Sequence, residues 1–194
     1  MYYNYPVIPT AEPIRVYFLM TFGYHILKTF EQVIAKVKRS DHIEMMLHHG
    51  LTVSLITFSY LVNIIEIGVL VVYVHDIADM FGHFGKAFSD THFKLVKYFN
   101  AVSMWGAWLY SRLIVFPYIT YYGELVIPYT KPHVSIYRGS YDESLTLIMV
   151  LFLFFLFLLN IWWFYLITVM IWRFARSGAD EDIQNKIQIN KKKN

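Results

Sequence analysis

An uncharged, strongly apolar run from Ser144 to Trp172 constrains this chain more than any other feature of its sequence. The run, SLTLIMVLFLFFLFLLNIWWFYLITVMIW, is longer than the ~20 residues that a helix needs to cross ~30 Å of hydrocarbon. Composition agrees, because 57% of the 194 residues are hydrophobic and only 16% are charged. Soluble domains usually carry more charge than this. The sequence therefore predicts an integral membrane protein.

A second apolar region runs from Leu51 to Val74 with Glu66 as its only charge. We expect it, with its flanks, to form two helices over about 43–62 and 65–87, joined by a tight turn near Asn63.

Two weaker runs complete the set of spans. The run 95–119 is expected to stop near Pro117, because proline lacks the amide proton that continues a helix. The run that starts at Ile14 carries Arg15, His25 and Lys28 among its apolar residues, so it either spans with one face against protein or lies partly in the interface.

These runs predict an all-α fold, a multi-pass transmembrane bundle of about five helices. The expected organisation is an N-terminal extension over 1–13, a transmembrane domain over 14–176 and a polar C-terminal tail over 177–194. Alternating five spans places the 36–42 loop, the 88–94 loop and the tail, which are rich in Lys and Arg, on one side. That side is predicted to be cytosolic, or the matrix side in a mitochondrion.

Composition also excludes some functions. The chain has no cysteine, so thiolate chemistry and disulfides are ruled out. Its net charge of +3 forms no extended basic face, so nucleic-acid binding gets no support. The first residues show neither a secretory signal nor a transit peptide pattern.

Ionisable side chains gather on one stripe of the predicted 65–87 helix. His75 and Asp79 are four residues apart, Asp76 and Asp79 are three apart, and His83 and Lys86 continue roughly the same face. Charged groups in a span are costly unless they are paired, and they usually mark a site. A functional site, a purely structural network and a metal site are the three interpretations that this stripe leaves open.

Two adjacent histidines, His48 and His49, precede it on the neighbouring helix, at a similar predicted depth to Asp79. Adjacent helical residues are ~100° apart, so the two imidazoles cannot address the same atom. We expect one to react, as a general base or as a nucleophile toward an activated acyl group, and the other to support it.

A metal site is possible because the two segments offer nitrogen and oxygen ligands suited to zinc or iron: His48, His49, His75, Asp76, Asp79 and His83. However, neither H-E-x-x-H nor a repeated H-x-x-H-H occurs, so we predict no bound metal and no cofactor.

Other polar positions have a structural explanation as well as a functional one. Thr52 could orient His48, although helical threonine most often bonds its own i−4 carbonyl. Ser59, Tyr60 and Asn63 could pin the turn. Arg112, deep in the 95–119 run, needs a carboxylate or a ligand phosphate or acyl carbonyl as partner.

Taken together, these residues resemble the ceramide synthase (Lag1) branch of the TRAM-LAG1-CLN8 (TLC) family. The resemblance rests on three motifs and covers roughly Ile14 to Asp182. The motifs are His48-His49-x-x-Thr52, Ser59-Tyr60-x-x-Asn63-x-x-Glu66-x-Gly68 and His75-Asp76-x-x-Asp79, followed by Lys86.

This resemblance implies an N-acyltransferase that moves a fatty acyl group from acyl-CoA, a substrate and not a cofactor, to the amine of a sphingoid base in the endoplasmic reticulum membrane. It implies catalytic roles for His48, His49, His75, Asp76 and Asp79. It also implies substrate-binding or supporting roles for a second set of residues: Thr52, Ser59, Tyr60, Asn63, Lys86 and Arg112.

The chain also departs from the family pattern. Glu66 replaces an arginine and Asn160 stands where histidine is common. Family members carry about two more transmembrane helices before the point where this chain starts, so a partner is expected to complete the acyl tunnel. The alternative is therefore a non-catalytic structural or lipid-binding subunit of a larger membrane complex, with the mitochondrial inner membrane as the alternative location. The expected partners are other membrane subunits or further copies of the same chain.

Overall fold

The computed structural model describes residues 10–34, 41–61, 64–87, 94–126 and 143–177, and every regular element among these residues is helical. The helices in chain order are α1 (Glu12–Ile34), α2 (His42–Leu61), α3 (Ile65–Ala87), α4 (Lys94–Trp108), η1 (Leu109–Val115), α5 (Phe116–Thr120), η2 (Tyr121–Val126) and α8 (Glu143–Ser177). Because α4 to η2 follow one another without a break, the described residues make five helical rods, which confirms the all-α prediction.

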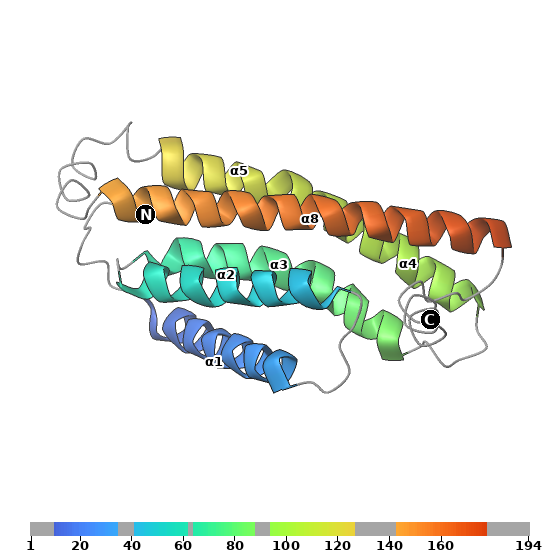
Figure 1. Ribbon diagram of the computed structural model, residues 1–194, viewed down its shortest axis with the longest axis horizontal. Coiled ribbons are helices and arrows are strands. Elements are labelled where there is room, and N and C mark those ends of the chain that lie inside the picture. The colour runs from blue at the N-terminus through green and yellow to red at the C-terminus, as the bar shows by residue number, and fades with distance from the viewer. Residues whose placement is uncertain (1–9, 35–40, 62–63, 88–93, 127–142, 178–194) are drawn as a thin grey trace.

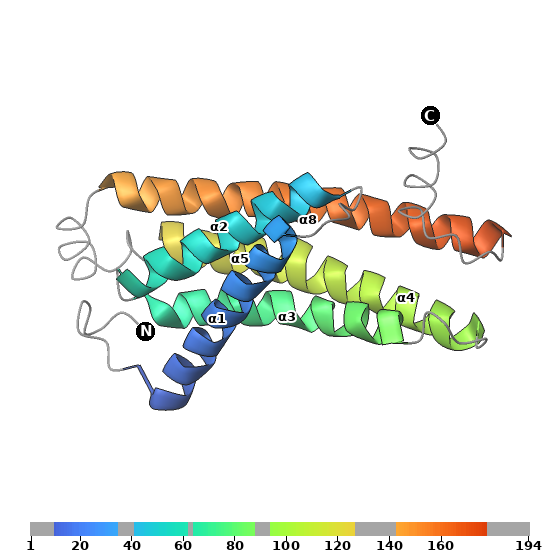
Figure 2. The same ribbon diagram turned by 60° about the horizontal axis from the view of Figure 1, so that its bottom comes forward.

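The rods are stacked in layers. In Figure 1, α8 and the rod from α4 to α5 lie on one side, α2 and α3 lie side by side next to them, and α1 lies outermost. Figure 2 shows that α1 crosses α2 and α3 obliquely. Helix α1 therefore closes the side of the α2–α3 pair that α8 does not cover.

One helix of the described residues, over Leu147–Arg173, is long and apolar enough to span a membrane on its own. No other single helix among these residues reaches that standard, and α4, with 15 residues, is too short for it. The number of membrane crossings thus stays a prediction.

The turn expected near Asn63 lies between α2 and α3, which end and begin at Leu61 and Ile65. Asn63 itself lies outside the described residues. The predicted domain termini 1–13 and 177–194 also lie mostly outside them, so those boundaries stay predictions.

The prediction that a helix ends near Pro117 is wrong. Helical structure continues to Val126, because the turn before the proline is a π-helix in which the Phe116 N–H bonds the Ser111 carbonyl five residues back. Proline has no N–H for an i−4 bond, and the chain meets it directly after a turn whose bonds already run to the fifth residue back. Proline therefore changes the register of this rod without ending it.

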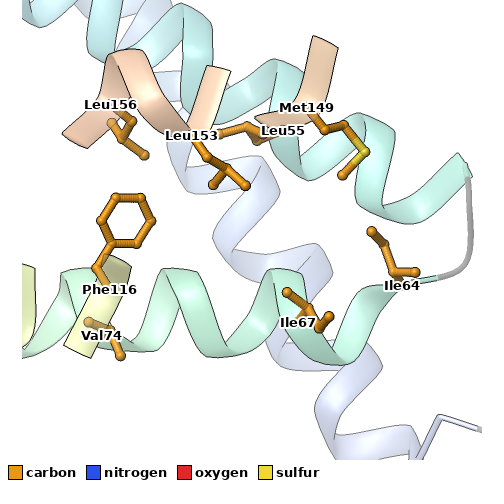
Figure 3. Packing of buried hydrophobic residues seen from close by; sticks show 8 residues of the cluster. All are labelled: Leu55, Ile64, Ile67, Val74, Phe116, Met149, Leu153 and Leu156. Atoms are coloured by element: carbon orange, nitrogen blue, oxygen red, sulfur yellow. The ribbon is translucent and has the colours of Figure 1, made fainter. Parts of the chain in front are cut away.

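Apolar side chains from α2, α3, α5 and α8 form the main core between the layers. Figure 3 shows Leu55, Val74 and Phe116 meeting Leu153 and Leu156 from α8. Phe116 follows the π-turn directly and is 1% exposed, so the turn directs this ring into the core. A second cluster, around Phe18, Ile56, Ile65 and Val72, fastens α1 to α2 and α3.

Helix α1 approaches α3 closely at Gly68. A Cβ atom there would lie 2.9 Å from the Phe18 ring and 3.0 Å from the Ser59 side chain. A side chain at this position, where α1, α2 and α3 meet, would force a neighbour to move, and Gly68 also lines the hollow described next.

Candidate functional site

A hollow of about 50 Å³ lies between α1, α2, α3 and α8. One end is polar and is lined by His25, His48, His75, Asp76 and Asp79. The rest is mainly apolar, lined by Thr52, Leu55, Ile56, Ser59, Ile67, Gly68, Val71, Val72, Met149, Leu153 and Leu156. Four of the five predicted catalytic residues thus share one hollow, as the expected common depth required.

His48 projects from α2 into the polar end and is 8% exposed. Its ring stands edge-on to Trp163 of α8, with centroids 5.2 Å apart, and lies 6.5 Å from the ring of His75. Its Nδ1 is buried and has no hydrogen-bond partner among the described residues. His48 is therefore a packed, oriented imidazole with one nitrogen left for a ligand.

His49 is buried but does not line the hollow. It turns from His48 toward α1, with its ring 5.5 Å from that of His48 and 6.0 Å from that of His25. The two adjacent histidines thus divide between the hollow and the α1–α2 contact, because successive helical side chains point ~100° apart.

His75 has partners on both of its ring nitrogens. Nδ1 lies 2.8 Å from the Val71 carbonyl, and Nε2 lies 3.2 Å from Nδ2 of Asn160. A carbonyl can only accept, so Nδ1 carries the proton and Nε2 accepts from the Asn160 amide. His75 is held in one tautomer and leaves no ring nitrogen for a substrate.

Arg112, 1% exposed, projects from the π-turn η1 and joins three helices. It forms an ion pair with Asp79, donates to the His75 carbonyl at 3.0 Å and donates to Oδ1 of Asn160 at 3.2 Å. The guanidinium also lies 4.0 Å from the centre of the Trp108 ring. The sequence predicts a carboxylate, a ligand phosphate or an acyl carbonyl as the partner of Arg112. The partner found in the structure is a carboxylate, that of Asp79.

Asp76 accepts a hydrogen bond from the Tyr17 hydroxyl on α1, at 2.6 Å. Asp79 is paired with Arg112, and its side chain is 47% exposed. The implied arrangement, in which these carboxylates hold His48 and His49, is therefore not the one found among the described residues. The carboxylates lie beside the imidazoles at the polar end and are bonded to Tyr17 and Arg112.

Only some of the predicted substrate-binding residues line the hollow. Thr52 and Ser59 line the hollow, with the Thr52 hydroxyl bonded to the His48 carbonyl at 2.8 Å, which is the local bond weighed from the sequence. Tyr60 is 52% exposed and does not line the hollow. Asn63 lies outside the described residues, as does the side chain of Lys86.

Three residues of the site did not emerge from the sequence as site residues: Tyr17, His25 and Asn160. Tyr17 and His25 lie on one face of α1 with the buried Thr21 between them, at a spacing of four residues. That spacing is the signal that could have revealed them. Asn160 is the only strongly polar residue in the middle of α8 and is completely buried.

Among the described residues, no group of three or more histidine or acidic side chains has the geometry to hold a metal ion. The hollow offers two imidazoles with an unpartnered Nδ1, those of His25 and His48, together with two carboxylates and an apolar extension. Carboxylates attract a cation, and an unpartnered imidazole nitrogen can accept a proton.

Comparison with known proteins agrees with the motifs. A family model described as the TLC domain matches residues 1–169. The chain is 27% identical over 190 residues to ceramide synthase hyl-1 of Caenorhabditis elegans, an alignment that covers 94% of this chain and 50% of the relative. It is 27% identical to ceramide synthase 4 of Bos taurus (95% and 45%) and 28% identical to ceramide synthase LOH2 of Arabidopsis thaliana (95% and 62%).

The chain thus spans about half the length of the curated relatives that it matches. No solved structure matches it. Since the family model covers most of the chain, including all three motifs and the hollow between them, this protein belongs to the TLC domain family.

Proposed function

We propose that this protein is an N-acyltransferase of the ceramide synthase type, which transfers a fatty acyl group from acyl-CoA to the amine of a sphingoid base. The observation that carries the proposal is the buried His48, whose unpaired Nδ1 lies at the polar end of an otherwise apolar hollow. The names of the relatives support the same chemistry.

The polar end of the hollow suits the amine of a sphingoid base, and the apolar part suits hydrocarbon. A primary alkylamine is protonated at neutral pH, since the related lysine side chain titrates at about 10.4, and Asp76 and Asp79 at the polar end would attract it. The apolar wall, from Leu55 and Ile67 to Met149, would exclude water and contact the part of a hydrocarbon chain next to the reacting group.

In the proposed step, the amine nitrogen attacks the thioester carbonyl carbon and forms the amide bond. His48 accepts the proton that the nitrogen loses in this attack, the carbon–sulfur bond breaks, and the proton passes to the departing thiolate of CoA. Acid–base help of this kind typically contributes about 10²- to 10⁴-fold in rate. Arg112 and Asn160 hold the α3 side of the pocket, and Thr52 is bonded to the carbonyl of His48.

The membrane setting is part of the proposal. The five rods would form a multi-pass bundle in the endoplasmic reticulum, with the mitochondrial inner membrane as the alternative, and with acyl-CoA approaching from the side rich in Lys and Arg. No bound cofactor is invoked.

The test uses the full chain in lipid nanodiscs with an acyl-CoA and sphinganine, and follows the N-acyl product by mass spectrometry. His48→Gln should lower the rate by about 10²-fold or more, because glutamine cannot exchange a proton in this way. His83→Gln is the matched control, since His83 is exposed and lies outside the hollow. Absence of product from folded wild-type protein would exclude the proposal.

A second candidate is a non-catalytic lipid-binding or structural membrane subunit. It is favoured by the polar network itself, because Arg112, Asp79, His75 and Asn160 bond one another across three elements and need no ligand. In that case wild type would make no product, and gentle detergent extraction would recover the chain in a stable complex with other membrane proteins.

A further inference from the structure

His25 of α1 is a second imidazole in the hollow that the proposed step does not use. It lines the polar end together with His48, yet it comes from a different helix. Its Nδ1 is buried and, like that of His48, has no hydrogen-bond partner among the described residues. His75, the third histidine of the hollow, differs because both its nitrogens are occupied. Two of the three lining imidazoles are therefore free to exchange a proton.

The chemistry requires two proton acceptors. A sphingoid base arrives as an ammonium ion, and an ammonium nitrogen has no lone pair with which to attack a carbonyl. It must lose one proton before the attack and a second during the attack. The thiolate of CoA takes up only one of these two protons, so the other must leave the hollow by a different route.

The two free imidazoles reach the hollow from different helices, His25 from α1 and His48 from α2. His49 lies near both, with its ring 6.0 Å from that of His25 and 5.5 Å from that of His48. Tyr17 fastens α1 to Asp76 on α3, which keeps His25 at the polar end. A neutral imidazole accepts a proton through its unprotonated ring nitrogen.

We propose that His25 is a second catalytic base of this site. It takes the first proton from the incoming ammonium and releases it to water, while His48 takes the second proton during the attack and passes it to sulfur. Nitrogen thereby loses two protons, the thiolate gains one, and one reaches the solvent. This inference rests on the proposed acyl transfer and adds a residue from α1 to it.

The test separates the two protons by changing the nucleophile. It compares sphinganine with an analogue whose amine is replaced by an alkoxyamine, which is uncharged at neutral pH and still nucleophilic. Four proteins are assayed in nanodiscs with one acyl-CoA: wild type, His25→Gln, His48→Gln and the control His83→Gln. Thermal unfolding of each variant is measured alongside to confirm that it is folded.

For His25→Gln we expect kcat/KM to fall by about 10²- to 10⁴-fold with sphinganine and to recover to within about tenfold of wild type with the alkoxyamine. His48→Gln should be slow with both nucleophiles, because each must still lose a proton during the attack. His83→Gln should match wild type with both.

Two results would overturn the role of His25 and leave the proposed function standing. One is a normal rate for His25→Gln with sphinganine. The other is an equal loss of kcat/KM with both nucleophiles, which would indicate a structural role. A wild-type protein that acylates neither nucleophile would instead remove the proposed function and this inference together.

Discussion

At the scale of single residues, the site is determined by which polar atoms have partners. The five buried side-chain atoms without a hydrogen-bond partner in the described residues include the Nδ1 atoms of His25, His48 and His49. Buried polar groups are normally paired, so unpaired ones at the edge of a hollow indicate where a ligand or water belongs. The paired ones, in His75 and Asn160, indicate support.

Asn160 gives a residue-scale prediction. It accepts from Arg112, donates to His75 and receives the Trp108 N–H on its backbone carbonyl, all in a fully buried position. Asn160→Leu would leave a guanidinium N–H and an imidazole nitrogen unpaired, so we expect the free energy of unfolding to fall by about 1–3 kcal/mol. Thermal or denaturant unfolding in bicelles measures the change.

Phe155→Leu is the control on the same helix, because Phe155 is 52% exposed and lies outside the network. If both variants unfold alike, the Asn160 amide contributes nothing to stability. Activity is also measured under conditions in which Asn160→Leu is fully folded. If the variant is then slower than wild type, the positioning of His75 by Asn160 contributes to the reaction.

At the scale of elements, the positions of the site residues depend on two irregular features, a π-turn and a close helix contact. The π-turn η1 presents Arg112 toward α3 and α8 within a rod that would otherwise follow an α-helical register. π-turns often occur at functional sites, because they re-aim side chains without ending the helix. The close contact at Gly68 brings α1 against α3.

Two glycines provide a matched prediction at this scale. Gly68→Ala would place a methyl group 2.9 Å from the Phe18 ring, so α1 must shift, and we expect a loss of about 1–3 kcal/mol in unfolding free energy. Gly50→Ala, in the middle of α2 with nothing within 4 Å of the added atom, should be neutral or stabilise by up to about 1 kcal/mol.

The same pair of variants also tests the hollow. A shift of α1 moves Tyr17 and His25 away from α3, so Gly68→Ala should lower any acyl transfer while Gly50→Ala retains it. Equal stability of the two proteins would mean that α1 does not pack on α3 as described.

At the scale of the whole molecule, the outer surface is strongly apolar. Many large apolar side chains are exposed on the outer faces of the rods, among them Leu27 and Phe30 on α1 and Leu95 and Phe99 on α4. An outer surface of this kind would aggregate in water, and lipid is the solvent that it suits. We therefore expect five crossings, although one helix alone satisfies the criterion of length and apolarity among the described residues.

The natural absence of cysteine makes the topology directly testable. Single cysteines at Ser40, Ser89 and Ser177 should react alike with a membrane-impermeant maleimide in sealed vesicles, and a cysteine at Ser135 should react only from the opposite side. The cysteine-free parent is the background control. Ser40 and Ser89 labelled from opposite sides would contradict five alternating spans.

The sequence by itself determined the helices, the apolar character and the two polar segments that meet, because hydrophobic runs and spacings of three or four residues are properties of a single helix. Tertiary structure alone decided which groups pair: it turned His49 out of the hollow, brought His25 and Tyr17 in from α1, joined Arg112 to Asn160, and carried the helix past Pro117. These outcomes depend on how each rod is rotated and how the rods cross, and those angles are fixed by packing between segments far apart in the chain, which no local pattern records.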